Sequence, residues 1–371
     1  MTHSRPSLVT LGTEVVARAL ACVAVLTIAA GGIGLAGPAA APSAAEHQLP
    51  QWSLADLPAK TGLVGVLVEP SRLGSATGMK PVYTFVLSAK KTIDITMYEF
   101  VDPTMVKDLV ADAHRGLKVR VILDTNRERS RNTATFNALK KGGVAVVWAD
   151  ASYEATHQKT ITVDRKESLV LSGNLTDEYY TTTRDFGIFD TNPSDVAEIE
   201  TVFSADFAHR PVTPLDEVDL VWSPGSQSRM LAIINGARHT LSIENEEMGD
   251  SAITKAIVAA AKRGVKVEIT MTADSEYDSD WTSIVKAGGH VHLYAYGYSD
   301  LYIHAKTTIA DAGSKSQKMY VGSINFSSAS MNRNRELGII TSGAATIKAV
   351  NSVVRSDYTD CTAATDCHNY T

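Results

Sequence analysis

The sequence predicts an α/β fold made of two similar lobes, each with a mixed sheet flanked by helices. Of its 371 residues, 44% are hydrophobic and 20% are charged, which supports a sizeable buried core and is unlike a disordered chain. Segments with the apolar spacing of helices alternate with short β-branched runs, the pattern of layered α/β proteins. The same order of segments occurs twice, which predicts a duplication.

The first 45 residues are predicted to be a signal peptide that is removed from the mature protein. Two arginines precede an apolar run over residues 19–37, and an A-x-A-like stretch of small residues follows it. We expect cleavage near Ala41 or Ala45, hence secretion, and a linker over residues 46–60. The alternative is an uncleaved membrane anchor, because the apolar run is almost long enough to span a bilayer.

The two copies can be followed element by element. Each has an early strand, in KKTIDITMYEF from Lys90 and in RHTLSIENEEM from Arg238. A helical pattern follows and ends in Arg-Gly, a C-capping signal, at Gly116 and at Gly264. The next β-branched runs, VRVIL and VEITM, predict the following strands. Because these equivalent glycines are 148 residues apart, the repeat has the size of a domain.

This spacing divides the chain into two lobes. We assign residues 61–210 to the first lobe and residues 218–360 to the second. The linker over residues 211–217 lies in a stretch with two prolines, which suits a boundary. Residues 125–135 are predicted to form a loop, and the basic cluster NRERSR within them is predicted to be solvated.

The tail over residues 361–371 contains Cys361 and Cys367. Of the three cysteines, Cys22 would be removed with the signal peptide, which leaves this pair. An even number of cysteines in an exported chain indicates a disulfide, which would close a short loop and hold the tail. The alternative is two free thiols. The cysteines do not have the spacing of a metal site.

Each copy carries a His-x-Lys string followed, five residues after the lysine, by an aspartate. The two strings are His157, Lys159 and Asp164, and His304, Lys306 and Asp311. If the string lies on a strand, its His and Lys face the same side. A cation beside an imidazole is suited to holding an anion next to a nucleophile.

A second polar segment follows each string and adds Ser-x-Asn and, later, an acidic residue. Its members are Ser172, Asn174 and Asp185 in the first copy, and Ser323, Asn325 and Glu336 in the second. Serine and asparagine supply neutral donors, and a carboxylate can fix the tautomer of a histidine. In the first copy Leu171 replaces a glycine, and Asp185 is shorter than Glu336, so we expect its support of the imidazole to be indirect or shifted.

Two such sets suit a phosphate diester attacked by imidazole. One histidine would attack phosphorus and form a phosphoenzyme, and the other would protonate the leaving alcohol and then deprotonate water. The lysines and asparagines would neutralise the charge on the phosphoryl oxygens. Because the lysines supply positive charge, we expect no metal and no cofactor.

The paired HxKxxxxD strings, with Ser-x-Asn and an acidic residue downstream, resemble those of the phospholipase D superfamily over residues 60–360. The resemblance implies two lobes related by a pseudo-twofold axis, one active site between them and a phosphohistidine intermediate. It implies that His157 is the nucleophile and His304 the general acid and base. The implied phosphate-binding residues are Lys159, Lys306, Asn174 and Asn325. The implied supporting residues are Asp164, Asp311, Ser172, Ser323, Asp185 and Glu336.

The expected function is hydrolysis of a phospholipid at a membrane surface, by a monomer, to phosphatidic acid and a head-group alcohol. Transfer to another alcohol is expected from the same intermediate. A secreted endonuclease is an alternative. It is not the expected function, because the formal charge of −6 does not favour nucleic acid as a partner. Two further functions remain open, a cardiolipin-synthase-like phosphatidyltransferase and a non-catalytic binding protein on the same scaffold.

Two further segments bear on the head group. In IENEEMGD, from Ile243, Glu244 and Glu246 replace apolar or neutral residues of the first copy, and carboxylates at a strand end would welcome a cationic head group. The alternative is a solvated turn. Of four nearby tyrosines, Tyr294 and Tyr296 are expected in an ordinary half-buried strand and turn. For Tyr298 and Tyr302 two interpretations remain open: the same strand and turn, or the mouth of the active site.

Overall fold

The computed structural model describes residues 63–69, 78–215, 219–296, 301–361 and 367–370. The predicted signal peptide with both cleavage positions, the linker over residues 46–60, and Tyr298 lie outside these residues. Among the described segments, no helix is both long and apolar enough to cross a membrane.

The first copy forms a mixed sheet with the strand order β1-β7-β6-β5-β2-β3-β4. Strands β2, β3 and β4 are parallel, and the other neighbours are antiparallel. The strands are β1 (Leu63–Glu69), β2 (Thr92–Met97), β3 (Lys118–Leu123), β4 (Ala145–Trp148), β5 (Thr160–Val163), β6 (Glu167–Leu171) and β7 (Thr183–Asp190). The helices are α2 (Lys80–Leu87), α3 (Pro103–His114), α4 (Arg129–Lys141), η2 (Asp177–Tyr179) and α5 (Pro193–Phe207).

The second copy repeats this order as β11-β10-β9-β13-β14-β15-β8 and adds β16 at the outer edge. Its strands are β8 (Leu220–Ser223), β9 (Thr240–Glu244), β10 (Lys266–Thr272), β11 (His290–Tyr294), β12 (Tyr302–Ile303), β13 (Thr307–Ala310), β14 (Lys318–Gly322), β15 (Glu336–Thr341) and β16 (Cys367–Tyr370). Its helices are α6 (Gln227–Gly236), α7 (Ser251–Lys262), η3 (Ser275–Tyr277), α8 (Asp278–Lys286), α9 (Ser328–Asn332) and α10 (Ala344–Cys361). The repeated order confirms the predicted duplicated α/β fold.

Equivalent residues begin and end equivalent helices. Asp102 caps α3 and Asp250 caps α7, each by accepting two backbone N–H groups of the first turn. Gly116 and Gly264 follow the two helices with φ of 91° and 87°, a left-handed conformation that glycine adopts without strain. Local signals therefore place the same strand–helix unit in both lobes.

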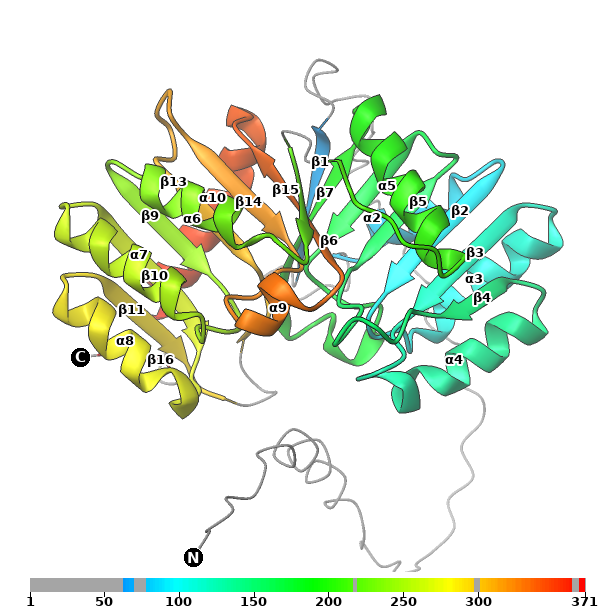
Figure 1. Ribbon diagram of the computed structural model, residues 1–371, viewed down its shortest axis with the longest axis horizontal. Coiled ribbons are helices and arrows are strands. Elements are labelled where there is room, and N and C mark those ends of the chain that lie inside the picture. The colour runs from blue at the N-terminus through cyan, green and yellow to red at the C-terminus, as the bar shows by residue number, and fades with distance from the viewer. Residues whose placement is uncertain (1–62, 70–77, 216–218, 297–300, 362–366, 371) are drawn as a thin grey trace, which may run out of the picture. The chain divides into compact units, whose positions relative to one another are not determined.

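The lobes meet through a hydrophobic core to which both contribute. Val170 on β6 and Phe186 on β7 pack in one cluster with Val321 on β14 and Leu337 on β15. Figure 1 shows the two sheets meeting at these four strands, with most of the helices farther out. Each lobe also has a separate core between its sheet and its own helices. The central cluster fixes the faces that the two lobes present to each other.

Two reciprocal buried ion pairs cross this interface. Arg184 on β7 pairs with Asp357 on α10 at 2.5 Å, and Arg335 pairs with Asp206 on α5 at 3.0 Å. Both arginines and Asp357 are almost completely inaccessible to solvent. Because each arginine comes immediately before the acidic residue of its motif, each motif contacts the last helix of the opposite lobe.

Two details of the sequence-based assignment are settled by the structure. Residues 125–135 are not a loop throughout, because α4 begins at Arg129. Cys361 and Cys367 form the predicted disulfide. The end of the tail then pairs with the sheet, since β16 lies antiparallel to β11.

Candidate active site

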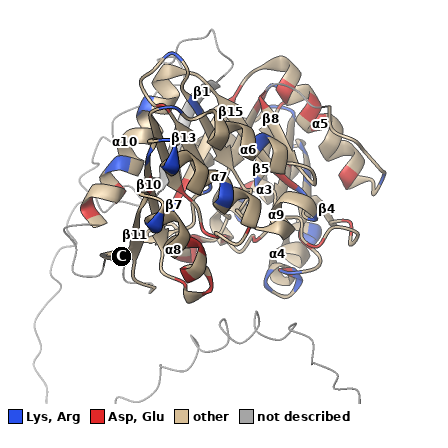
Figure 2. Ribbon diagram, turned by 60° about the vertical axis from the view of Figure 1, so that its left-hand side comes forward, with Lys and Arg blue, Asp and Glu red and all other residues tan. Residues whose placement is uncertain are grey.

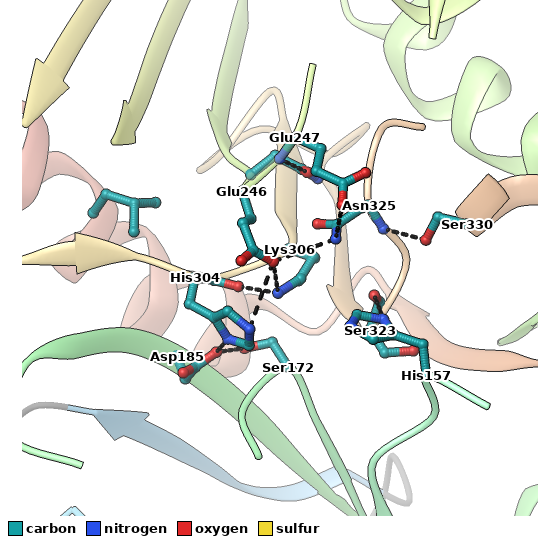
Figure 3. A network of polar contacts seen from close by, with 12 residues as sticks. His157, Ser172, Asp185, Glu246, Glu247, His304, Lys306, Ser323, Asn325 and Ser330 are labelled. Atoms are coloured by element: carbon teal, nitrogen blue, oxygen red, sulfur yellow. Dashed lines mark hydrogen bonds and ion pairs between the residues drawn. The ribbon is translucent and has the colours of Figure 1, made fainter. Parts of the chain in front are cut away.

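A pocket of about 280 Å³ lies between the lobes and is lined by both. His157, Asn174 and Asp185 come from the first copy, and His304 and Asn325 come from the second. Residues of both motifs therefore meet in one place, and Figure 3 shows His157 and Asp185 of the first copy near His304 and Asn325 of the second.

Each His-x-Lys string lies just before a strand rather than within it, which corrects the expectation. The chain at His157 and Gln158 donates its backbone N–H groups to the carbonyl of Arg335 in the other lobe. Likewise, His304 donates its backbone N–H to the carbonyl of Arg184. The strings leave their own sheets because they form main-chain hydrogen bonds across the interface.

The two lysines are fully buried beneath the histidines. Lys159 Nζ donates to the carbonyl of His157 at 2.7 Å, and Lys306 makes the equivalent bond to His304. Burial, and then the neighbouring charge of Lys306, lower the pKa of Lys159 to about 7. Lys159 therefore changes charge near neutral pH.

Each histidine is oriented by the carboxylate of the opposite lobe. His157 Nδ1 donates to Glu336 Oε2 at 3.0 Å, and His304 Nδ1 donates to Asp185 Oδ1 at 2.8 Å. These bonds place the proton on Nδ1, so Nε2 of a neutral ring carries the lone pair. The support from Asp185 is direct, and the expectation of indirect support was wrong.

Asp185 reaches His304 although it is shorter than Glu336, because its surroundings hold it in place. Ser172 Oγ donates to Asp185 Oδ1 at 2.6 Å. A Cβ on Gly173 would lie 2.9 Å from Asp185 Cγ, so the glycine makes room for this carboxylate. The predicted Ser-x-Asn segment thus supports the carboxylate as well as supplying Asn174.

Glu336 is held by its own set of donors. Ser330 Oγ and Asn334 Nδ2 both donate to Glu336 Oε1. Burial raises the pKa of Glu336, but His157, Lys159 and Ser330 together lower it more, and the net pKa lies below its usual range. Asp185 behaves in the same way beside His304. Both carboxylates therefore accept hydrogen bonds in their charged form.

The two serines differ in their contacts. Ser323 Oγ bonds to the main chain of Leu337, and its carbonyl lies 3.2 Å from His157 Nδ1. Leu171, the departure from the second copy, lies in the core of the first lobe opposite Gly187. That departure leaves the polar contacts of the site intact.

Asp164 and Asp311 do not lie in the pocket, which corrects their assignment as supports of the site. Each stands at the far end of the strand that follows its His-x-Lys string, with φ of 52° and 54°. Asp311 accepts the backbone N–H groups of residues 238–240, and Asp164 accepts those of residues 90–92. They join neighbouring strands of the sheet.

Glu246 enters the pocket and contacts the second set of motif residues. Its Oε2 lies 2.8 Å from Lys306 Nζ, 3.3 Å from Asn325 Nδ2 and 3.5 Å from His304 Nε2. Burial raises the pKa of Glu246, but His304 and Lys306 lower it further, so it is charged. Burial, with repulsion from Glu246, raises the pKa of the adjacent Glu247 to about 7. The expectation that a carboxylate faces the site is met by Glu246, whereas Glu244 is buried in β9 and does not line the pocket.

Tyrosines form much of the remaining lining. Tyr98, Tyr179, Tyr180, Tyr296 and Tyr302 all border the pocket. Tyr296 is 58% exposed and belongs to the site, contrary to expectation. Tyr294 is buried and donates to the carbonyl of Asp357. In the basic cluster, Arg127 and Arg129 are exposed as expected, whereas Arg131 pairs with the pocket residue Glu99.

The described part of the chain has no group of three or more His, Cys, Asp or Glu side chains placed to hold a metal ion.

The fold and the pocket define a two-lobed α/β protein with one His-Lys-Asn set from each lobe. The sequence family described as "Cardiolipin synthase, PLD-like domain" matches residues 83–207 and 230–358. Since these ranges cover more than half of the chain, the protein belongs to the phospholipase D superfamily, whose members act on phosphodiester bonds.

Two solved structures share this fold, and a curated relative matches part of the sequence. Polyphosphate kinase from Porphyromonas gingivalis superposes with a TM-score of 0.64 at 13% identity, over 82% of this chain and 48% of that one. Phosphatidylserine synthase from Haemophilus influenzae superposes with a TM-score of 0.61 at 11% identity, over 82% and 87%. A polyphosphate kinase from Exiguobacterium sibiricum is 31% identical over 101 residues, which is 25% of this chain and 14% of the kinase. The chain thus matches a small part of that curated relative.

Proposed function

We propose that this protein is a phospholipase D-type phosphodiesterase that hydrolyses a phospholipid to phosphatidic acid and its head-group alcohol. The observation that supports it most is the convergence of His157 and His304 in one pocket, each oriented by a carboxylate of the opposite lobe. This arrangement leaves two Nε2 atoms available for chemistry on one phosphoryl group.

His157 is the proposed nucleophile. Burial, and then the charge of Lys159, lower its pKa, which favours the neutral ring. Its Nε2 lone pair attacks phosphorus, the phosphorus–oxygen bond to the head-group alcohol breaks, and a phosphohistidine forms. Lys159, Lys306, Asn174 and Asn325 are proposed to bind the phosphoryl oxygens.

His304 is the proposed general acid and base. As an imidazolium it would have a carboxylate at each ring nitrogen, Asp185 at 2.8 Å and Glu246 at 3.5 Å. It gives its Nε2 proton to the leaving alkoxide, then takes a proton from water as the water attacks phosphorus. The phosphorus–nitrogen bond then breaks, and the electron pair returns to His157.

The proposed substrate is a phospholipid at a membrane surface, met outside the cell by a secreted monomer. The acidic net charge and the mixture of both signs on single helices support a lipid over a polynucleotide (Figure 2). For example, α8 begins with Asp278 and Asp280 and ends with Lys286. The disulfide between Cys361 and Cys367 supports export, because such bonds persist in oxidising compartments.

A phosphatidyltransferase is the second candidate, because the matching family is described as a cardiolipin synthase. It would share the phosphohistidine and differ in the acceptor, an alcohol instead of water. The ratio of transfer to hydrolysis in the presence of glycerol separates the two.

Head-group release from phosphatidylcholine vesicles tests the proposal, with a chelator present and His304→Ala as the control. Choline released by the wild type and not by the variant supports it. The absence of release from phosphatidylcholine and from other phospholipids would overturn it.

A further inference from the structure

The carboxylate of Glu246 contacts the same groups of the second copy that are proposed to bind a phosphoryl group. One oxygen, Oε2, lies within 3.5 Å of Lys306 Nζ, Asn325 Nδ2 and His304 Nε2. The other, Oε1, accepts from the hydroxyl of Tyr302 at 3.0 Å. Figure 3 shows this carboxylate between Lys306, Asn325 and His304. An oxygen of a bound phosphoryl group would need the same three partners.

The first copy has no such carboxylate at the equivalent place. Tyr98 corresponds to Glu246 in the repeat, 148 residues earlier. Its ring lies edge-on to His157 at 4.5 Å and 4.8 Å from Lys159 Nζ. The neutral ring of Tyr98 gives Lys159 no carboxylate at this position, whereas Lys306 has that of Glu246. At this pair of equivalent positions the two copies therefore differ by one negative charge.

The side chain of Glu246 can change its rotamer while hydrogen bonds fix the backbone around it. The Asn245 side chain accepts the backbone N–H groups of Glu247 and Phe326, which fixes the turn after β9. The Glu246 side chain is 23% exposed and borders the pocket. A rotamer change of Glu246 would release Lys306 from its carboxylate, whereas Asn325 Nδ2 also donates to Glu247 Oε1 at 3.1 Å. The displaced charge of Glu246 stays near the ligand.

We propose that Glu246 competes with the phosphoryl group for the donors of the second copy and thereby makes the site prefer monoanionic diesters to dianionic monoesters. This inference rests on the proposed function, because it places a phosphoryl group between the two histidines. The Coulomb energy between Glu246 and a ligand scales with the ligand's charge, so a dianion is repelled about twice as strongly as a monoanion. A phosphate monoester, the chemical class of the product, gains its second negative charge near pH 6. Glu246 would therefore favour release of that product.

Binding of two small anions to the full mature chain tests this without turnover. The probes are inorganic phosphate at pH 8, mainly a dianion, and dimethyl phosphate, a monoanion, measured by titration calorimetry. Glu246→Gln keeps the shape and removes the charge, and Glu276→Gln is the control because Glu276 is an exposed carboxylate of the same lobe. We expect Glu246→Gln to tighten inorganic phosphate at least tenfold and dimethyl phosphate clearly less, with the control unchanged.

Three results would overturn the inference: equal affinities in all proteins, equal tightening for both anions, or weaker binding in Glu246→Gln. Glu246→Ala is a second variant, and thermal melting verifies that each variant is folded. Because the readout is binding, a failure of phospholipid hydrolysis leaves this test decisive. Conversely, unchanged anion binding would remove the role of Glu246 and leave the phosphodiesterase proposal in place.

Discussion

Asp185 and Glu336 show how a single carboxylate sets the chemistry of a histidine. By accepting from Nδ1, each directs the lone pair of Nε2 into the pocket. In a serine protease, replacing the equivalent aspartate with asparagine leaves the geometry intact but favours the wrong tautomer. The same reasoning applies to both histidines here.

We predict that Asp185→Asn and Glu336→Gln each lower kcat by up to about 10⁴, the loss that removal of the orienting carboxylate produces in a serine protease. Steady-state phosphodiester hydrolysis measures the effect. The two variants should keep wild-type melting temperatures to within a few degrees. A kcat within threefold of the wild type in either variant would show that its carboxylate does not orient the histidine.

Lys159 makes the site sensitive to pH near neutrality. Its pKa of about 7 means that it is charged below pH 7 and neutral above it. We predict that kcat/KM falls as the pH rises through about 7, because phosphate loses one cationic partner. On the acid side, the lowered pKa of His157 keeps the nucleophile neutral below its ordinary titration range. A kcat/KM that is constant from pH 6 to pH 9 would contradict this account of Lys159.

The sequence predicted some residues of the site and not others. The repeat spacing identified His157, Lys159, Asn174 and their counterparts, because each pair occupies equivalent positions. It could not reveal that the carboxylates cross between lobes, since spacing along the chain does not say which copy a side chain faces. Arg335 and Asp206 carried a usable signal, because both recur 151 residues from a counterpart, at Arg184 and Asp357.

At the scale of elements, Asp164 and Asp311 stabilise the sheets. Burial raises the pKa of Asp311, but the backbone N–H groups of residues 238–240 lower it further, and the net pKa lies below the usual range. Its contribution is therefore fully present above its unfolded pKa of about 3.9 and is lost as the pH falls through its lower folded pKa.

We predict that Asp311→Ala lowers the free energy of unfolding by ~1–3 kcal/mol at pH 7, the cost of removing a buried carboxylate that accepts three backbone N–H groups. Urea denaturation at pH 7 and near pH 3 measures it, and the difference from the wild type should shrink at the lower pH. Pocket chemistry should be unaffected per folded molecule. A loss of kcat without a loss of stability would mean that Asp311 supports the active site and not the sheet.

The elements themselves were largely readable from the sequence. Asp102 with Gly116, and Asp250 with Gly264, mark the two ends of α3 and α7 by local chemistry. The start of α4 was missed because NRERSR resembles a solvated loop, and the pairing of Arg131 with Glu99 depends on tertiary structure. The His-x-Lys segments were assigned to strands because alternation does not distinguish a strand from an extended segment bonded to another lobe.

At the scale of the whole molecule, the lobes are bound by the central core and the reciprocal ion pairs. Removing one partner of a buried pair leaves an uncompensated charge, which costs about 3–5 kcal/mol. We predict a loss of stability at the lower end of this range for Asp357→Asn, which removes the carboxylate 2.5 Å from Arg184. The charge of Glu244 also acts on this guanidinium and compensates part of the loss. Arg184 directly precedes Asp185, whose carboxylate orients His304, so we also expect kcat to fall.

Denaturant unfolding followed by both tryptophan fluorescence and activity measures this prediction, with the exposed Asp278→Asn as the matched control. Coincident transitions are expected, since both lobes share the central core. A wild-type midpoint for Asp357→Asn would mean that the pair does not hold the lobes together.

The most direct test of the central claim is to trap the phosphoenzyme. A diester labelled in the phosphoryl group is mixed with the wild type, His157→Ala and His304→Ala, and the protein is denatured at alkaline pH and mapped by mass spectrometry. The account predicts labelled His157 in the wild type, accumulation of that label in His304→Ala when the leaving group needs no proton, and no label in His157→Ala. Label on His304 in the His157→Ala variant would reverse the two roles, and no label in any protein would contradict covalent catalysis.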